Sequence, residues 1–380
     1  MQAREILKSP ENEQVSTPVK GEWSMKSGKI RVGKNVLRAA VVFILLGGSI
    51  ACSLYMKYAG QERKTVLFST DIAIDGDFDD YFDLVVMKSM EGVDLKIIVD
   101  GNDSAQKQSG QDAVRNLEKI TGGGYGASLV ITGRDHNLES PDDSDAVGKL
   151  VRILENTKGT MDIVTVGSLR DVAALYNCCP DLFEEKVEKL WIFAGDAQGT
   201  MLETNVFLDE TAFLRVMNSG KADIYWIPCF QSGIWTTGPN TSYFTVRHEE
   251  VFRNANPDLL AWFLYRYEKS GVDFQDFISQ EHDTGAFMPE TRNLWCSSIL
   301  PLVDGSMEHY WKKYCGSHDC GEAFPFGFTE KKVSFREGGK VEWGRGNVVH
   351  VFEVYDFDAY VAFSKFILEE IFREFQSKGG

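Results

Sequence analysis

The chain has 380 residues, of which 43% are hydrophobic and 12% are aromatic. This supply of apolar side chains is sufficient for a large buried core and excludes a disordered protein. The formal net charge is −16. Nucleic acid is therefore not expected as a partner, because a surface that binds a phosphate backbone needs clustered Lys and Arg.

The N-terminal part of the chain is the least globular. Residues 1–38 form a polar, basic leader, and within residues 39–56 the run AAVVFILLGGSIACSLY carries no charge. Such a run is near the minimum length of a transmembrane helix, and the basic residues before it place the leader in the cytoplasm. The run predicts a transmembrane or signal-anchor helix, with cleavage as a signal peptide as the alternative. We therefore expect contact with a membrane through this segment, and a membrane-anchored or secreted main domain on the non-cytoplasmic side.

Two cysteines are spaced to form a disulfide, which suits an exported chain. Cys315 and Cys320 flank the sequence GSHD, so a bond between them would close a short loop.

Residues 64–378 alternate short apolar strands with helices. Strands are predicted over residues 65–70, 94–99, 128–132, 162–166 and 190–193. Helices are predicted over residues 81–90, 172–176, 181–187, 257–267, 293–303 and 359–375, and also around Val114, Leu117 and Ile120. The alternation predicts one α/β domain with an open, mostly parallel sheet and helices on both faces. Ligands bind such sheets at the carboxyl ends of the strands, where an aspartate-rich segment, Asn102, Gly167 and Gly195 would lie.

The aspartate-rich segment, Asp75-Gly76-Asp77-Phe78-Asp79-Asp80, follows the first predicted strand. The carboxylates of Asp75, Asp79 and Asp80 would repel one another unless a hard dication such as Ca²⁺ were bound through their oxygens. An EF-hand is excluded, because the position of its last ligand falls on Val86. The alternative is a solvated acidic turn that stabilises the start of the next helix.

This segment resembles the DxDxxxDD motif of the nucleoside hydrolases, which cleave N-ribosidic bonds with a bound Ca²⁺. Aligned without a gap, the first aspartate of the motif falls on Ala73, and the other three fall on Asp75, Asp79 and Asp80. A rival register begins at Asp71 and needs an insertion of two residues.

Three further segments are similar to segments of that family and follow in the same order. They are VDLKIIVDGN at 93–102, VTVGSLRDVAA at 164–174 and ETNVFLD at 203–209. The resemblance implies that Asp75 is the general base and that the main-chain carbonyl of Val166 reaches the metal. It also implies that Asn102, Glu203 and Asn205 bind the sugar.

The C-terminal half departs from the family pattern. A divergent branch of the family has a Trp-Asp pair that completes the metal site, and the matching residues here are Trp295 and Cys296. A thiol is a poor ligand for Ca²⁺. Asp283, Asp71 or Asp77 would then be alternative ligands.

Protonation of the leaving group has no obvious donor in the sequence. His282 is a candidate, although a single histidine is more often structural. Trp235, Trp295 and Phe230 are candidates for stacking on a base, although an aromatic residue in an apolar stretch more often belongs to the core.

The resemblance implies hydrolysis of the N-glycosidic bond of a ribonucleoside, or of a related ribosyl compound, by a Ca²⁺-bound water. The alternative is a non-catalytic relative at the cell surface that binds a ligand or a protein partner. Either activity is compatible with a homo-oligomer.

Overall fold

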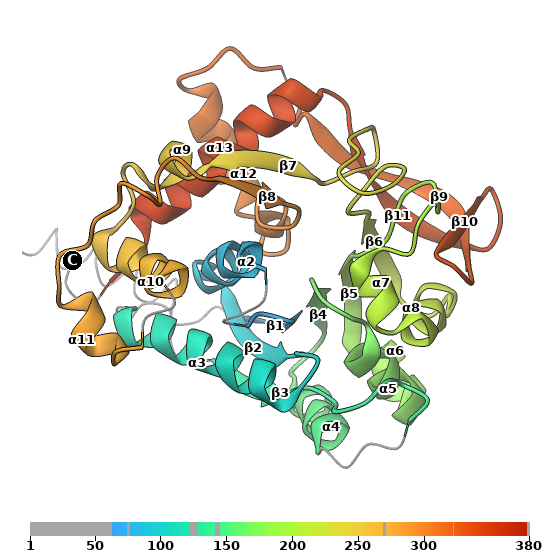
Figure 1. Cartoon of the computed structure of the whole chain (residues 1–380). Helices are drawn as coiled ribbons and strands as arrows, with labels where there is room; N and C mark the ends of the chain where they lie inside the picture. The colour runs from blue at the N-terminus through green and yellow to red at the C-terminus, as the bar shows by residue number, and fades with distance from the viewer. Residues whose placement is uncertain are drawn as a thin grey trace, which may run out of the picture. The chain divides into compact units, whose positions relative to one another are not determined.

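The computed structural model describes residues 63–73, 77–121, 128–140, 145–268, 271–321 and 323–377. Within these residues, nine strands form one sheet in the order β10-β9-β11-β6-β5-β4-β1-β2-β3, and β7 and β8 form a separate antiparallel pair (Figure 1). The strands are β1 Lys64–Thr70, β2 Val93–Val99, β3 Leu129–Thr132, β4 Met161–Thr165, β5 Val187–Phe193, β6 Asp223–Ile227, β7 Phe244–Arg247, β8 Thr291–Leu294, β9 Phe326–Arg336, β10 Lys340–Trp343 and β11 Asn347–Val354.

Helices follow most of the parallel strands and cover the sheet on both faces (Figure 1). They are α2 Asp79–Lys88, α3 Ser104–Ile120, α4 Ala146–Asn156, α5 Arg170–Cys178, α6 Pro180–Lys186, α7 Thr204–Leu208, α8 Glu210–Met217, α9 His248–Phe252, α10 Pro257–Tyr267, α11 Phe274–Ile278, α12 Met307–Cys315 and α13 Phe357–Glu374. The predicted open, mostly parallel sheet with helices on both faces is confirmed.

Side chains point alternately to the two faces of the sheet along each strand, and an apolar core lies on each face. In β1, Val66 and Phe68 pack with helices α2, α10 and α13. Leu67 points to the opposite face and packs with α4, α5 and α8. Successive side chains of a strand point to opposite faces, so a strand that is apolar throughout is covered on both sides.

Parallel pairing brings the carboxyl ends of the strands to one edge of the sheet. β1 pairs in parallel with β2 on one side and with β4 on the other. β4, β5 and β6 continue the parallel order, and β11 pairs in parallel with β6. The antiparallel strands β9 and β10, which the sequence patterns did not predict, extend the sheet beyond β11.

The helix predicted over Asn293–Val303 is wrong. Thr291–Leu294 form β8, which pairs with β7, and Leu300–Leu302 form a 3₁₀ turn. Pro301 has no backbone N–H to donate and disfavours a continuous α-helix through this stretch. The disulfide predicted between Cys315 and Cys320 is confirmed.

The predicted membrane segment, residues 39–56, and the leader before it lie outside the described residues. Among the described helices, none combines the length and the apolar character needed to cross a bilayer.

Candidate functional site

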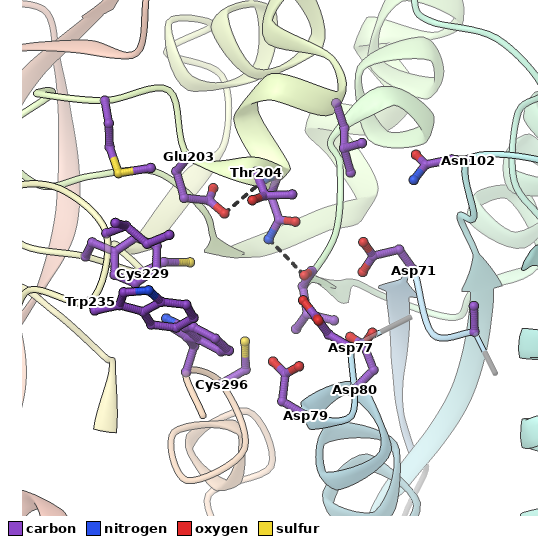
Figure 2. A pocket seen from close by; sticks show the side chains of 18 of the residues that line it. Asp71, Asp77, Asp79, Asp80, Asn102, Glu203, Thr204, Cys229, Trp235 and Cys296 are labelled. Carbon is purple, nitrogen blue, oxygen red and sulfur yellow. Dashed lines mark hydrogen bonds between the residues drawn. The ribbon is translucent and has the colours of Figure 1, made fainter. Parts of the chain in front are cut away.

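The carboxyl ends of the parallel strands surround the candidate site. Asp71 follows β1, Asn102 follows β2, Val166 follows β4 and Cys229 follows β6. These segments and the N-terminus of α2 enclose a cavity of about 440 Å³ (Figure 2). Its lining residues are Asp71, Ala73, Asp77, Asp79, Asp80, Asn102, Gln106, Val166, Met201, Glu203, Thr204, Asn205, Leu208, Cys229, Phe230, Ile234, Trp235, Trp295 and Cys296.

Four aspartate side chains gather on one side of this cavity, namely Asp71, Asp77, Asp79 and Asp80 (Figure 2). Desolvation by the surrounding protein, together with the charges of Asp77 and Glu203, raises the pKa of Asp71 to about 7. Desolvation and neighbouring carboxylates also raise the pKa values of Asp79 and Asp80 well above the usual range. The group is therefore poorly stabilised as free anions, and a bound cation would offset the repulsion.

A fifth aspartate lies behind this group, one turn further along α2. Asp83 is 1% exposed and accepts a hydrogen bond from the Ser297 hydroxyl. Burial raises its pKa to about 7, against the opposing effects of Ser297 and the Cys296 thiol. Cys296 and Ser297, in the segment that follows β8, thus contact Asp83 of α2.

Asn205 joins the ends of two neighbouring strands. Its side-chain Nδ2 donates to the carbonyl of Val166 at 2.9 Å and to the carbonyl of Phe193 at 3.1 Å. Both donors of the amide are therefore used, and Oδ1 is the atom left to accept a hydrogen bond from a ligand. The Val166 carbonyl keeps its second lone pair for a ligand or a metal.

Glu203 is a structural cap as well as a wall of the cavity. Its carboxylate accepts hydrogen bonds from the backbone N–H of Gly195 at 2.8 Å and of Asn205 at 3.0 Å. Burial raises the pKa of Glu203, and these backbone donors oppose the rise. The side chain caps the N-terminus of α7 and so fixes Asn205 in place.

A buried ion pair supports Asn102. Arg170 lies 3.1 Å from Asp100 through Nε, and its guanidinium approaches Asn102 Oδ1 at 3.4 Å. The backbone N–H of Asn102 donates to the side chain of Gln106 at 2.9 Å. The backbone amide is thus satisfied within the protein, so a ligand would meet the Asn102 side chain.

The structure separates the residues predicted from the sequence into three groups. Those that line the cavity are Asp71, Asp77, Asp79, Asp80, Asn102, Val166, Glu203, Asn205, Phe230, Trp235, Trp295 and Cys296. Asp75, the predicted general base, lies outside the described residues. His282 and Asp283 do not line the cavity: the His282 ring stacks on Phe277 at 4.0 Å, and Asp283 is exposed.

Several residues of the site have no family motif that would have identified them. Cys229 enters the cavity because it follows β6, a strand that was not predicted. Its neighbour Phe230 was predicted only as an aromatic residue that could stack on a base. Asp83 lies on α2 at the spacing that places it one turn after Asp79 and Asp80. From that spacing, Asp83 could have been placed on the same face of the helix as Asp79 and Asp80.

The chemistry of these residues suits a metal ion, but the arrangement of the described residues does not form a complete metal site. The donors are hard oxygens held in a desolvated place, which suits Ca²⁺. Within the part of the chain that the structure describes, no group of three or more His, Cys, Asp or Glu side chains is arranged to hold a metal ion.

No protein-family model and no curated protein matches the sequence. Solved structures do match the fold. Inosine-guanosine nucleoside hydrolase is 12% identical, with a TM-score of 0.51, over 81% of this chain and 99% of that one. The type III effector protein XopQ, complexed with adenosine diphosphate ribose, is 16% identical, with a TM-score of 0.51, over 85% and 98%.

The purine-preferring ribonucleoside hydrolase from Gardnerella vaginalis is 13% identical, with a TM-score of 0.50, over 82% of this chain and 99% of that one. At these identities the likeness establishes the fold. The chain has the fold of the nucleoside hydrolases, and the resemblance predicted from its sequence is confirmed at that level.

Proposed function

We propose that the protein hydrolyses the N-glycosidic bond of a ribonucleoside or of a related ribosyl compound. The observation that carries this proposal is the convergence of aspartate, glutamate and asparagine side chains on one cavity at the carboxyl edge of a nucleoside hydrolase fold. Hydroxyl groups of a sugar are bound by such acceptors, and a developing oxocarbenium ion is stabilised by nearby carboxylates.

The sugar would be held by the side chains opposite the aspartates. Asn205 Oδ1 and the Asn102 side chain offer acceptors to ribose hydroxyls, and Glu203 fixes the position of Asn205. Holding the sugar in one orientation places its anomeric carbon against the carboxylates and lowers the entropy lost in the transition state.

The base that activates water is proposed among the aspartates. The resemblance assigns this role to Asp75. Asp71 is a second candidate, because its carboxyl group lines the cavity beside the other aspartates.

We also propose Ca²⁺ as the cofactor, with Asp71, Asp79, Asp80 and the Val166 carbonyl as ligands together with Asp75. A bound Ca²⁺ would lower the pKa of a coordinated water and orient it. The support is the oxygen chemistry of these donors and their mutual repulsion. Cys296 is a poor ligand for this ion.

Calorimetric titration of the purified chain with Ca²⁺ and then with ribose tests both parts. We expect Ca²⁺ binding that Asp80→Asn abolishes. The matched control is Asp94→Asn, because Asp94 lies on β2 at the opposite edge of the sheet, paired with Lys96 at 2.7 Å. A wild-type chain that binds no Ca²⁺ would refute the metal-dependent hydrolase.

A second candidate is a non-catalytic protein that binds a ribosyl ligand in the same cavity or a partner at its surface. The observation in its favour is Cys296, which stands where an aspartate completes the metal site in the family branch that the sequence resembles. Release of free ribose from a nucleoside distinguishes the two: binding without any release of ribose would favour this candidate.

We further propose that residues 64–378 form a domain on the non-cytoplasmic side of a membrane, anchored there or released. The support is the charge-free run within residues 39–56, the basic leader and the Cys315–Cys320 disulfide. Protease digestion of intact cells tests this: a domain that resists protease until the cells are lysed would contradict it.

A further inference from the structure

A cluster of four aromatic rings lies on the side of the cavity away from the aspartates. We call Phe230, Trp235, Tyr243 and Trp295 the aromatic wall. Ring centroids of Trp235 and Trp295 are 5.8 Å apart, and those of Tyr243 and Trp295 are 5.7 Å apart. Phe230 meets Trp295 edge to face at 5.9 Å. Phe230, Trp235 and Trp295 line the cavity, and Tyr243 supports them.

Trp235 has an unfavourable backbone conformation and an exposed side chain. Its side chain is 49% exposed, and its backbone φ is 61°. A bulky residue in the left-handed region is uncommon and costs free energy, as does exposure of an indole ring to water. Such an arrangement is typical of a position that is kept for ligand contact. Figure 2 shows Trp235 beside Cys229 and Cys296, across the cavity from Asp71.

The charge of the cavity has one sign. The described lining residues contribute five carboxyl groups, from Asp71, Asp77, Asp79, Asp80 and Glu203, and no Lys, Arg or His. One divalent cation would favour the ionised form of these carboxyl groups and offset two of their charges. A cavity of this sign attracts cations, and aromatic faces bind them further through the ring quadrupole.

Among the described residues, the wall side of the cavity also offers no effective acid. The ionisable lining groups there are the Cys229 and Cys296 thiols, which are weak acids, and the Glu203 carboxylate, whose two oxygens already accept from the backbone N–H groups of Gly195 and Asn205. The Tyr243 hydroxyl donates its proton to Asn293 Oδ1 at 3.0 Å. A neutral purine or pyrimidine leaves slowly unless an acid protonates it.

We infer that the preferred substrate is an N-ribosyl compound whose leaving group is a cationic heteroaromatic ring of the pyridinium class. This rests on the proposed function. When the C1′–N bond breaks, its electron pair neutralises the ring nitrogen, so the ring leaves uncharged without receiving a proton. The water oxygen forms the new bond to C1′, and the water proton passes to a carboxylate and then to solvent. The products are ribose, the neutral pyridine and one proton.

Binding tests the charge preference separately from catalysis. The probes are nicotinamide riboside, which is cationic, and its reduced dihydro form, which is neutral and nearly equal in shape. Calorimetry with the full chain is expected to give at least tenfold tighter binding of the cationic probe. Equal affinities would overturn the inference and leave the proposed hydrolase intact.

Turnover provides the second measurement. We expect kcat/KM for nicotinamide riboside to exceed the values for inosine and uridine by 100-fold or more at neutral pH. Faster cleavage of inosine or uridine would overturn the inference while supporting the proposed function. Failure to cleave any of the three, together with absence of binding, would overturn both.

Trp235→Leu keeps an apolar side chain and removes the ring. We expect this variant to lose most of the preference for the cationic probe in binding. The control is Trp343→Leu, because Trp343 lies on β10 away from the cavity lining and faces Lys331. If Trp235→Leu retained the full preference, the aromatic wall would not be its source.

Discussion

The side-chain amide of Asn205 donates to the Val166 carbonyl at 2.9 Å, and so connects α7 to the end of β4. Its other bond, to the carbonyl of Phe193, reaches the end of β5. One side chain thereby sets the spacing of two strand ends in the candidate site.

Asn205→Asp is expected to disrupt this arrangement, because a carboxylate would face two carbonyl oxygens with no proton to donate. The free energy of unfolding should fall by about 2 kcal/mol, and ribose affinity should fall at least tenfold. Urea denaturation and calorimetry measure the two effects. Asn116→Asp is the control, because Asn116 lies on the surface of α3 and accepts from Lys119. Equal stability of the two variants would contradict the bridging role.

Glu203→Gln tests the cap of α7. The two carboxylate oxygens of Glu203 accept from separate backbone N–H groups. Glutamine offers one oxygen, and its NH₂ would face the other donor. We expect the free energy of unfolding to fall by roughly 1–2 kcal/mol.

The matched control for this cap is Glu210→Gln. Glu210 uses a single oxygen, Oε1, for the backbone N–H groups of Gly338 and Gly339. Glutamine can keep that oxygen in place, so a much smaller loss is expected in urea denaturation. A comparable loss in both variants would contradict the two-oxygen cap.

The outline of the parallel sheet could be predicted from the sequence, whereas the strands that position the far half of the site could not. β1 and β2 are apolar strands followed by Asp71 and Asn102. The hydrophobic pattern of the strands and the position of these two polar residues could therefore both be recognised in the sequence. Cys229 follows β6, Asp223–Ile227, which was not predicted as a strand. Trp295 was placed in a helix, although pairing of β8 with β7 determines its position. Pairing between distant segments leaves no local signal.

Cys296→Asp tests whether the family's metal site is incomplete in this chain. The new carboxylate would lie beside Asp83 and Asp79, whose charges add to the effect of burial in raising the pKa of the Cys296 thiol. Without metal, we expect a lower melting temperature than wild type, because another buried charge adds repulsion. With Ca²⁺, we expect about tenfold tighter binding by calorimetry and recovery of the melting temperature.

Cys296→Asn is the control for this change, since it has the same shape without the charge. Its melting temperature should neither fall without metal nor rise again with Ca²⁺. Equal Ca²⁺ affinity of the aspartate and asparagine variants would show that position 296 does not face the metal.

His248 predicts a dependence of stability on pH. Arg292 Nε donates to His248 Nε2 at 3.0 Å, so Nε2 has no proton and Nδ1 donates to the Phe287 carbonyl at 3.0 Å. Burial, and next the charge of Arg292, lower the pKa of His248 to about 4. The unfolded chain binds this proton near pH 6.5. The stabilisation is therefore complete above pH 6.5 and is lost as the pH falls from 6.5 towards 4.

The slope attributable to His248 is at most about 1.4 kcal/mol per pH unit. Urea denaturation between pH 4.5 and 7.5 measures it. His248→Gln keeps one acceptor and one donor but does not titrate, so it should flatten this part of the profile. His309→Gln, on the exposed surface of α12, should leave the profile unchanged. An identical slope in wild type and His248→Gln would contradict the assignment.

Gly110 is where α3 approaches the loop that carries Asp71. A Cβ at this position would lie 2.1 Å from the carbonyl oxygen of Ile72 and 2.6 Å from a methyl group of Val99. Gly110→Ala should therefore push the helix away from the loop and lower the free energy of unfolding by about 2 kcal/mol.

Because Ile72 directly follows Asp71, the same displacement should weaken Ca²⁺ binding. The control is Gly92→Ala, where a Cβ meets nothing within 4 Å. Urea denaturation and Ca²⁺ calorimetry on both variants separate the two consequences. If Gly110→Ala lost stability but kept its Ca²⁺ affinity, Asp71 would not be a ligand and the gap-free register would be favoured. If both fell together, the register that begins at Asp71 would be favoured.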